Sequence, residues 1–153
     1  MARLFSPARV AGVGLLILLL TVTGCGASKF ADVQGKVTYR GKPVVYGTVV
    51  VVGADQMPRY GTIRLDGTYT IKKVPVGPAR FGVNSPDPFY EPPASAQAKA
   101  DALERQQKAG LETPVKPPKG AWFRIPGHYG DPRTSNLSAE VVAPEVTVDL
   151  TLQ

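Results

Sequence analysis

The single cysteine of this chain, Cys25, has the most distinctive chemical setting. It closes the stretch VTGC at residues 22–25, directly after the uncharged apolar run 10–22. Arg3 and Arg9 precede that run and give the chain a basic start. A basic start, a short apolar run and small residues before a processing point are the layout of a secretory signal peptide. The pattern predicts that the chain is exported and that its first residues are removed.

Residues 22–25 resemble a bacterial lipobox, in which the cysteine is acylated and becomes the first mature residue. The resemblance implies that residues 1–24 are a lipoprotein signal peptide and that Cys25 carries acyl chains such as palmitate. It places the protein in the cell envelope, lipid-anchored to a membrane on the exported side. An uncleaved anchor and a secreted form without lipid are the alternatives. A spanning helix needs about 20 apolar residues, and this run is shorter.

His128 is the only histidine, and Asp131 and Ser135 follow it closely. These residue types could form a hydrolase triad if a rigid scaffold held them together. They lie instead on a proline-broken segment, so we expect a surface or partly packed histidine. A catalytic zinc needs about three protein ligands and calcium about six to eight oxygens, whereas Asp66 and Asp87 are isolated acids. The sequence predicts no metal, no cofactor and no enzymatic activity.

Five aromatic residues of the middle segment are candidates for binding. They are Phe89, Tyr90, Trp122, Phe123 and Tyr129. Aromatic side chains on a long loop can bind a sugar, a peptide or a protein. More often, such residues pin a long loop to the rest of the domain. The net charge of +6 comes from scattered lysines and arginines, a pattern that indicates a solvated surface and not a nucleic-acid site.

Short alternating stretches surround this middle segment and predict strands. Apolar and polar residues alternate with a period of two, and one stretch carries four consecutive valines. Tyr69 and Phe81 fall in the inward phase. Turn residues separate the stretches, which are 33–40, 46–52, 59–65, 68–74, 80–84, 137–142 and 145–152. We expect an all-β domain over 32–153, a seven-stranded antiparallel sandwich joined to Cys25 by a tether at 25–31.

The insertion 85–136 interrupts the strand pattern for about fifty residues. Unstructured loops beyond about 15 residues are uncommon unless they are functional or disordered. Residues 94–109 are rich in helix formers and lie between a Pro-Pro pair and Gly110, so they predict one short helix. Its apolar face is thin, and we expect it on the surface.

Residues 35–44 (GKVTYRGKPV) resemble the opening strand and turn of carboxypeptidase regulatory-like domains, and the resemblance continues at 47–51, 65–71 and 74–77. These domains have a transthyretin-like, seven-stranded Greek-key sandwich. Residues 125–135 are similar to small planctomycete lipoproteins of this class. Hydroxyisourate hydrolases and intradiol dioxygenases share related sandwiches, but they need several histidines. The resemblance therefore implies a fold and a location and not a reaction.

The sequence thus predicts a lipid-anchored, non-enzymatic envelope protein. The sandwich is expected to supply stability, and the insertion to present a surface to an envelope protein. The alternative is a carbohydrate- or wall-binding module that uses the aromatics of the insertion. An enzyme of an unrecognised type is the least favoured hypothesis, because no paired acid and base is visible in the sequence.

Overall fold

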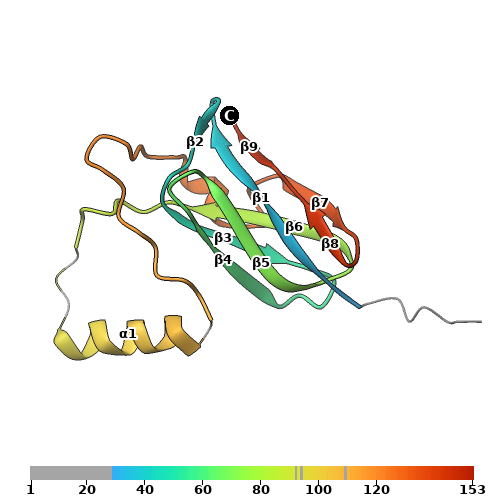
Figure 1. Ribbon diagram of the computed structural model, residues 1–153, viewed down its shortest axis with the longest axis horizontal. Helices are drawn as coiled ribbons and strands as arrows, with labels where there is room; N and C mark the ends of the chain where they lie inside the picture. Colours follow the sequence, from blue (N-terminus) through green and yellow to red (C-terminus); the bar gives the residue numbers. More distant parts are fainter. Residues whose placement is uncertain (1–28, 92, 94, 109) are drawn as a thin grey trace, which may run out of the picture.

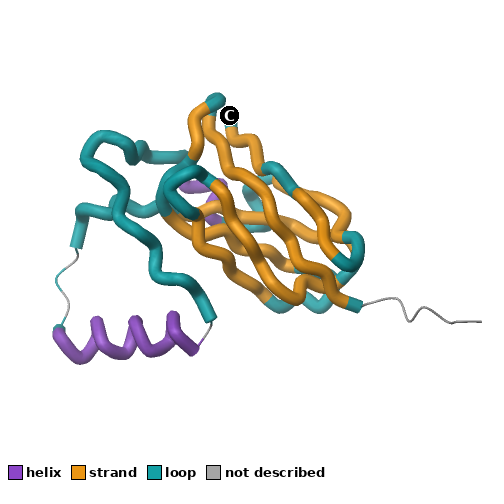
Figure 2. Tube along the Cα trace, viewed as in Figure 1, coloured by secondary structure: helices purple, strands orange, loops and turns teal. Residues whose placement is uncertain are grey.

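The computed structural model describes residues 29–91, 93, 95–108 and 110–153. The predicted signal peptide, Cys25 and most of the predicted tether lie outside the described residues. Two β-sheets pack face to face, and one helix stands apart from them (Figures 1 and 2). The strands are β1 (Phe30–Tyr39), β2 (Lys42–Pro43), β3 (Gly47–Val52), β4 (Pro58–Ile63), β5 (Thr68–Pro75), β6 (Gly77–Asn84), β7 (Leu137–Val141), β8 (Glu145–Thr147) and β9 (Leu150–Leu152).

The first sheet is built around β1. Strands β5 and β2 pair antiparallel with it, and β8 and β9 pair parallel with it. The second sheet has the order β4-β3-β6-β7, and all of its pairs are antiparallel. The predicted all-β sandwich with one short helix is therefore confirmed.

Two details of the predicted strand plan are wrong. The sandwich is not antiparallel throughout, because the chain crosses to the other sheet after β7 and then runs beside β1 in the same direction. The seven predicted strands are all present, but the last one is divided into β8 and β9, and β2 is additional. The division falls at Val148, whose carbonyl accepts a hydrogen bond from the Tyr69 hydroxyl at 2.7 Å instead of continuing the ladder.

The first strand also begins earlier than expected. Phe30 pairs with Pro75 and Ala31 with Val74, and Ala31 is buried. The predicted tether at 25–31 therefore includes two residues that belong to the sandwich.

The core lies between the two sheets and follows the predicted alternation. Tyr69 and Phe81, both predicted to point inward, are buried. Burial raises the pKa of the Tyr69 phenol, and the negative charge of Asp149 raises it further. Ionising this side chain inside the sandwich is therefore unfavourable.

The insertion has two parts that behave differently. Its first part carries α1 (Ala96–Lys108), which confirms the predicted surface helix, since none of its described residues is buried. The Ser95 hydroxyl accepts a hydrogen bond from the Ala98 backbone amide at 3.1 Å and so caps the start of the helix. Its second part returns to the sandwich through the 3-10 helix η1 (Gly127–Gly130), and Ile125 and Tyr129 join the core. The return segment of the insertion is therefore part of the packed domain. None of the helices in the described part of the chain has the length and apolar character needed to cross a membrane.

We predict that residues 94–110 can be replaced by a short Gly/Ser linker without loss of the fold. The helix buries no described side chain, and the free energy of loop closure changes slowly with length. The melting temperature should fall by no more than about 5 °C, as expected for a change of under about 1 kcal/mol. Thermal unfolding followed by circular dichroism measures this. Loss of cooperative melting would contradict the prediction and would make the helix part of the folding unit.

Candidate functional site

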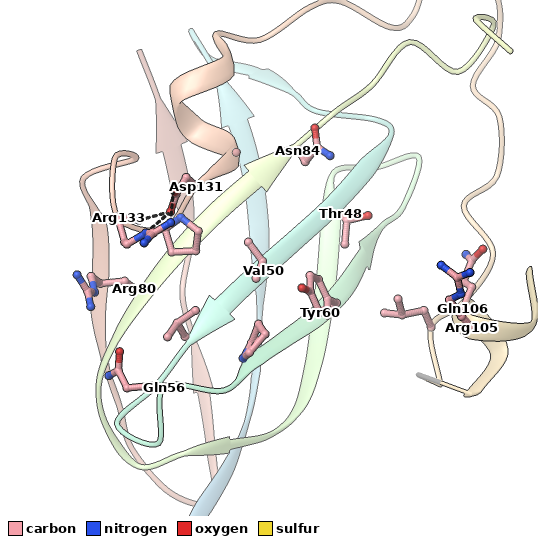
Figure 3. A pocket seen from close by; sticks show the side chains of 15 residues that line it. Thr48, Val50, Gln56, Tyr60, Arg80, Asn84, Arg105, Gln106, Asp131 and Arg133 are labelled. Atoms are coloured by element: carbon pink, nitrogen blue, oxygen red, sulfur yellow. Dashed lines mark hydrogen bonds and ion pairs between the residues drawn. The ribbon is translucent and has the colours of Figure 1, made fainter. Parts of the chain in front are cut away.

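A groove of about 770 Å³ lies on the outer face of the second sheet. The return segment at 130–133 forms one wall, and the end of α1 forms the other (Figure 3). Its lining residues are Thr48, Val50, Val52, Gln56, Pro58, Tyr60, Arg80, Asn84, Arg105, Gln106, Leu111, Gly130, Asp131, Pro132 and Arg133. We call this feature the outer groove.

Strand alternation produces the floor of the outer groove. Val49 and Val51 point into the core, so Val50 between them points outward. Val50 pairs with Tyr60 of β4, whose ring is largely exposed on the floor. The floor is therefore an apolar surface with one accessible aromatic ring.

Gly82 of β6 allows the return segment to lie directly on the sheet. A Cβ at this position would lie 2.9 Å from Pro132 Cδ and 3.0 Å from the Gly130 carbonyl oxygen. Such distances are too short for a side chain, so only glycine permits this approach. The first wall of the outer groove is thus fixed by a single residue without a side chain.

The first wall carries two charged groups, and Arg80 of β6 lies near them. Arg133 forms an ion pair with Asp131 at 3.1 Å. Hydrogen bonds from Arg133 lower the pKa of the Asp131 carboxyl, and the positive charges of Arg133 and Arg80 lower it further. Asp131 therefore stays ionised and neutralises one of the two arginines.

The second wall is held in place by Glu112. The Thr62 hydroxyl of β4 donates to the Glu112 carbonyl at 2.7 Å, and the Gln106 amide of α1 donates to the same oxygen at 3.3 Å. Arg64 adds an ion pair to the Glu112 carboxylate at 3.3 Å. These contacts bring Arg105 of α1 to the edge of the outer groove.

The outer groove carries a net positive charge. Within the described part of the chain, neither Arg80 nor Arg105 has a carboxylate within 4.0 Å. They lie on opposite sides of the floor (Figure 3). Two arginines that line one groove, each with no carboxylate of the described chain within 4.0 Å, can each bind a carboxylate, sulfate or phosphate group.

The structure uses the three residues of the considered triad in other ways. The Ser135 hydroxyl donates to the Phe81 carbonyl and accepts the Leu137 amide, and it is buried. Asp131 is paired with Arg133, and His128 is exposed with its ring 4.1 Å from that of Tyr129. The three side chains are therefore held by separate structural contacts. The described residues also include no group of three His, Cys, Asp or Glu side chains that could hold a metal.

Two of the five candidate aromatics, Phe123 and Tyr129, attach the insertion to the sandwich, and a third, Trp122, joins two parts of the insertion. The Trp122 indole donates to the Ser85 hydroxyl at 3.1 Å, and Phe123 stacks on Tyr39 at 5.9 Å between ring centroids. Tyr129 is buried, and its hydroxyl donates to the Gln153 carbonyl at 3.0 Å. Only Phe89 and Tyr90 of the five are largely exposed.

The aromatic ring in the outer groove is instead Tyr60, which sequence reasoning did not select. It lies on one of the predicted strands, and its outward phase in the alternation was the available signal. Nothing in the sequence showed that Arg80 and Arg105 would line the same groove, because one belongs to a strand and the other to the insertion helix.

No family model matches the chain, and no curated protein sequence matches it. Among solved structures, the T6 backbone pilin of serotype M6 Streptococcus pyogenes, which has a modular three-domain structure, is similar over part of the fold. The TM-score is 0.34 and the identity 10%, and the likeness covers 43% of this chain and 15% of the pilin chain.

Proposed function

We propose that this chain is a lipid-anchored, non-enzymatic binding protein of the cell envelope, with a sandwich of the carboxypeptidase regulatory-like, transthyretin-like type. Its partner is an acidic, extended segment of an envelope protein, bound in the outer groove. The observation that carries this proposal is the pair of arginines, Arg80 and Arg105, that line the groove and have no carboxylate within 4.0 Å among the described residues.

The shape of the outer groove favours an extended ligand. Its floor follows β3 from Thr48 to Val52, and both walls rise above the sheet. Guanidinium groups form paired hydrogen bonds with carboxylates, and the Tyr60 ring offers an apolar surface next to them. An acidic peptide can satisfy both features at once.

A second candidate is an acidic polysaccharide. Tyr60 lies on the same floor as the amide side chains of Gln56 and Asn84. The two amides lie toward opposite ends of the floor (Figure 3), so an extended sugar chain can contact both while it passes over the aromatic ring. This candidate replaces the predicted aromatic surface of the insertion with a different aromatic residue.

We predict that the double substitution Arg80→Gln and Arg105→Gln weakens binding of polyglutamate. The loss should be at least about tenfold, because two charge-assisted hydrogen bonds are removed and about 1.4 kcal/mol corresponds to tenfold. Calorimetric titration of the chain with polyglutamate and with polygalacturonate measures it. Arg124→Gln is the matched control, since Arg124 is exposed but does not line the groove. Tighter binding of polygalacturonate would favour the second candidate, and no binding of either polymer would overturn the assignment of the groove.

We predict separately that the mature protein begins at an acylated Cys25. The intact mass of membrane-extracted protein should correspond to residues 25–153 plus lipid. Cys25→Ser should leave the uncleaved precursor, because the residue that is acylated before cleavage is absent. An unmodified mass for residues 1–153, measured in the native host, would show that the anchor is wrong.

A further inference from the structure

Four apolar side chains are exposed at the end of the sandwich where β1 begins. The exposed fractions are 47% for Phe30, 62% for Met57, 39% for Val76 and 55% for Val142. We call these four residues the basal surface. Each comes from a different part of the chain, so no local sequence pattern requires them to be apolar together.

Backbone pairing brings three of the four residues to one end. Phe30 pairs with Pro75, and the Val76 amide donates to the Lys29 carbonyl at 3.1 Å. Val142 follows the last residue of β7, which pairs with Gly77 next to Val76. These three residues therefore lie on the first strand and on two turns of the sandwich.

Arg59 connects Met57 to the same end. Its guanidinium lies 6.0 Å from the centroid of the Phe30 ring and also donates to the Met57 carbonyl at 3.3 Å. The turn that carries Met57 is thus held next to the start of β1.

Charged groups around the basal surface largely cancel one another. Arg59 pairs with Asp55 at 2.8 Å, and Lys72 pairs with Asp32 at 2.7 Å. Lys29 and Lys73 are balanced by Glu140 and Glu145, which lie on β7 and β8 close to this end. A partner that binds here must therefore be recognised mainly through apolar contact and not through net charge.

We propose that the basal surface docks on the lipid bilayer that holds the acyl chains of Cys25. The proposal rests on the proposed lipid anchor. Only residues 25–29 precede Phe30 in the mature chain, and at about 3.5 Å per residue they reach at most about 18 Å. The end of the sandwich that carries the basal surface is thus the end held at the membrane. Apolar side chains in such a position insert about 5–10 Å into the boundary between headgroups and acyl chains.

Docking in this way sets the orientation of the whole domain. The helix α1 lies on the opposite side of the sandwich from the point where the chain enters β1 (Figure 1). The second wall of the outer groove then faces away from the bilayer, where an envelope partner can reach it. The anchor and the groove would serve one purpose, which is to present a binding surface at a fixed height above the membrane.

Oxidation of Met57 tests this proposal without a foreign probe. The chain contains two methionines, Met1 and Met57, so the mature protein has Met57 alone. Membrane-extracted acylated protein is reconstituted into phosphatidylcholine/phosphatidylglycerol vesicles, and hydrogen peroxide converts exposed methionine to the sulfoxide, which intact mass detects. The reference is residues 25–153 with Cys25→Ser in buffer. This segment contains every strand and every core residue of the sandwich.

Docking is expected to slow sulfoxide formation by at least about fivefold, because the thioether enters the lipid boundary. The protection of Met57 should persist in 0.5 M NaCl, where the Debye length is about 4 Å and attraction between charges is screened. Val76→Ser with Val142→Ser should restore the rate seen in buffer. Leu65→Ser is the matched control, an exposed apolar residue in the turn before β5, and it should leave the protection unchanged.

Two results overturn the proposal while leaving the anchor intact. One is acylated, vesicle-bound protein whose Met57 is oxidised at the rate seen in buffer. The other is oxidation of Met57 in buffer that becomes slower as the protein concentration rises. That result assigns the basal surface to an interface between two copies of the chain. If the extracted protein carries no lipid, the proposed lipid anchor is wrong, and this result alone does not decide whether the basal surface docks. Coupling the Cys25 thiol of residues 25–153 to a maleimide phospholipid in the same vesicles then decides whether the basal surface docks.

Discussion

Phe81→Ala is expected to lower the free energy of unfolding by about 3–5 kcal/mol, the range for removing a fully buried aromatic ring from a core. Phe81 is fully buried on β6, where it pairs with Val51 on one side and Leu137 on the other. Its carbonyl also accepts the hydroxyl of Ser135, so the backbone around it is fixed by the return segment. The cavity cannot close easily, because strands on both sides hold β6 in place.

Urea unfolding of residues 25–153 with Cys25→Ser measures this loss. Tyr69→Ala should give a loss of similar size, since Tyr69 fills the same core from the other sheet. Tyr60→Ala is the control, an aromatic truncation on the exposed floor of the outer groove, and it should cost less than about 1 kcal/mol. Losses below about 1 kcal/mol for both Phe81→Ala and Tyr69→Ala would mean that the core is assigned incorrectly.

The positions of Tyr69 and Phe81 were predictable because they follow from local alternation. A strand with one face buried must place every second side chain inward, and this rule needs no knowledge of its neighbours. The helix at Ala96–Lys108 was predictable for the same reason, because helix formers between proline and glycine act over a few residues.

The arrangement of the last strands and of the outer groove could not be predicted in this way. Whether β8 and β9 run parallel or antiparallel to β1 depends on which sheet the chain enters after β7, and that choice is made by packing between distant segments. The same applies to Arg105, which lines the outer groove on a segment that the hydrogen bond between Thr62 and Glu112 connects to β4. The aromatics of the insertion were visible in the sequence, but their burial depends on contacts such as the stacking of Phe123 on Tyr39.

Gly35→Ala should destabilise the domain by at least about 3 kcal/mol, because the new methyl group has no space. Gly35 lies on β1 in the same phase as the buried Val33 and Val37, so its missing side chain would point toward the core. A Cβ there would overlap the carbonyl group of Val148. The strands β1, β8 and β9 would have to move apart at the point where they meet.

The same position places a hydrogen bond that closes the sandwich. Gly35 pairs directly with Tyr69, and the Val148 carbonyl above it accepts the Tyr69 hydroxyl at 2.7 Å. An alanine would push this carbonyl away and leave a buried hydroxyl without its partner, which adds to the steric cost. Gly35 is thus the residue that lets the junction between β8 and β9 approach β1 closely enough for the Val148 carbonyl to bond to the core tyrosine.

Two variants separate the steric effect from the hydrogen bond. Tyr69→Phe keeps the ring and removes only the hydroxyl, so it should cost about 1 kcal/mol. Gly127→Ala is the control for adding a methyl group to a glycine, because no atom lies within 4 Å of a Cβ built there, and it should change the stability by less than about 0.5 kcal/mol. If Gly35→Ala does not fold, a loss of about 1 kcal/mol for Tyr69→Phe and an unchanged stability for Gly127→Ala still support the close approach of the Val148 carbonyl to β1. A Gly35→Ala protein as stable as the wild type would show that β1 and the Val148 carbonyl do not approach each other in this way.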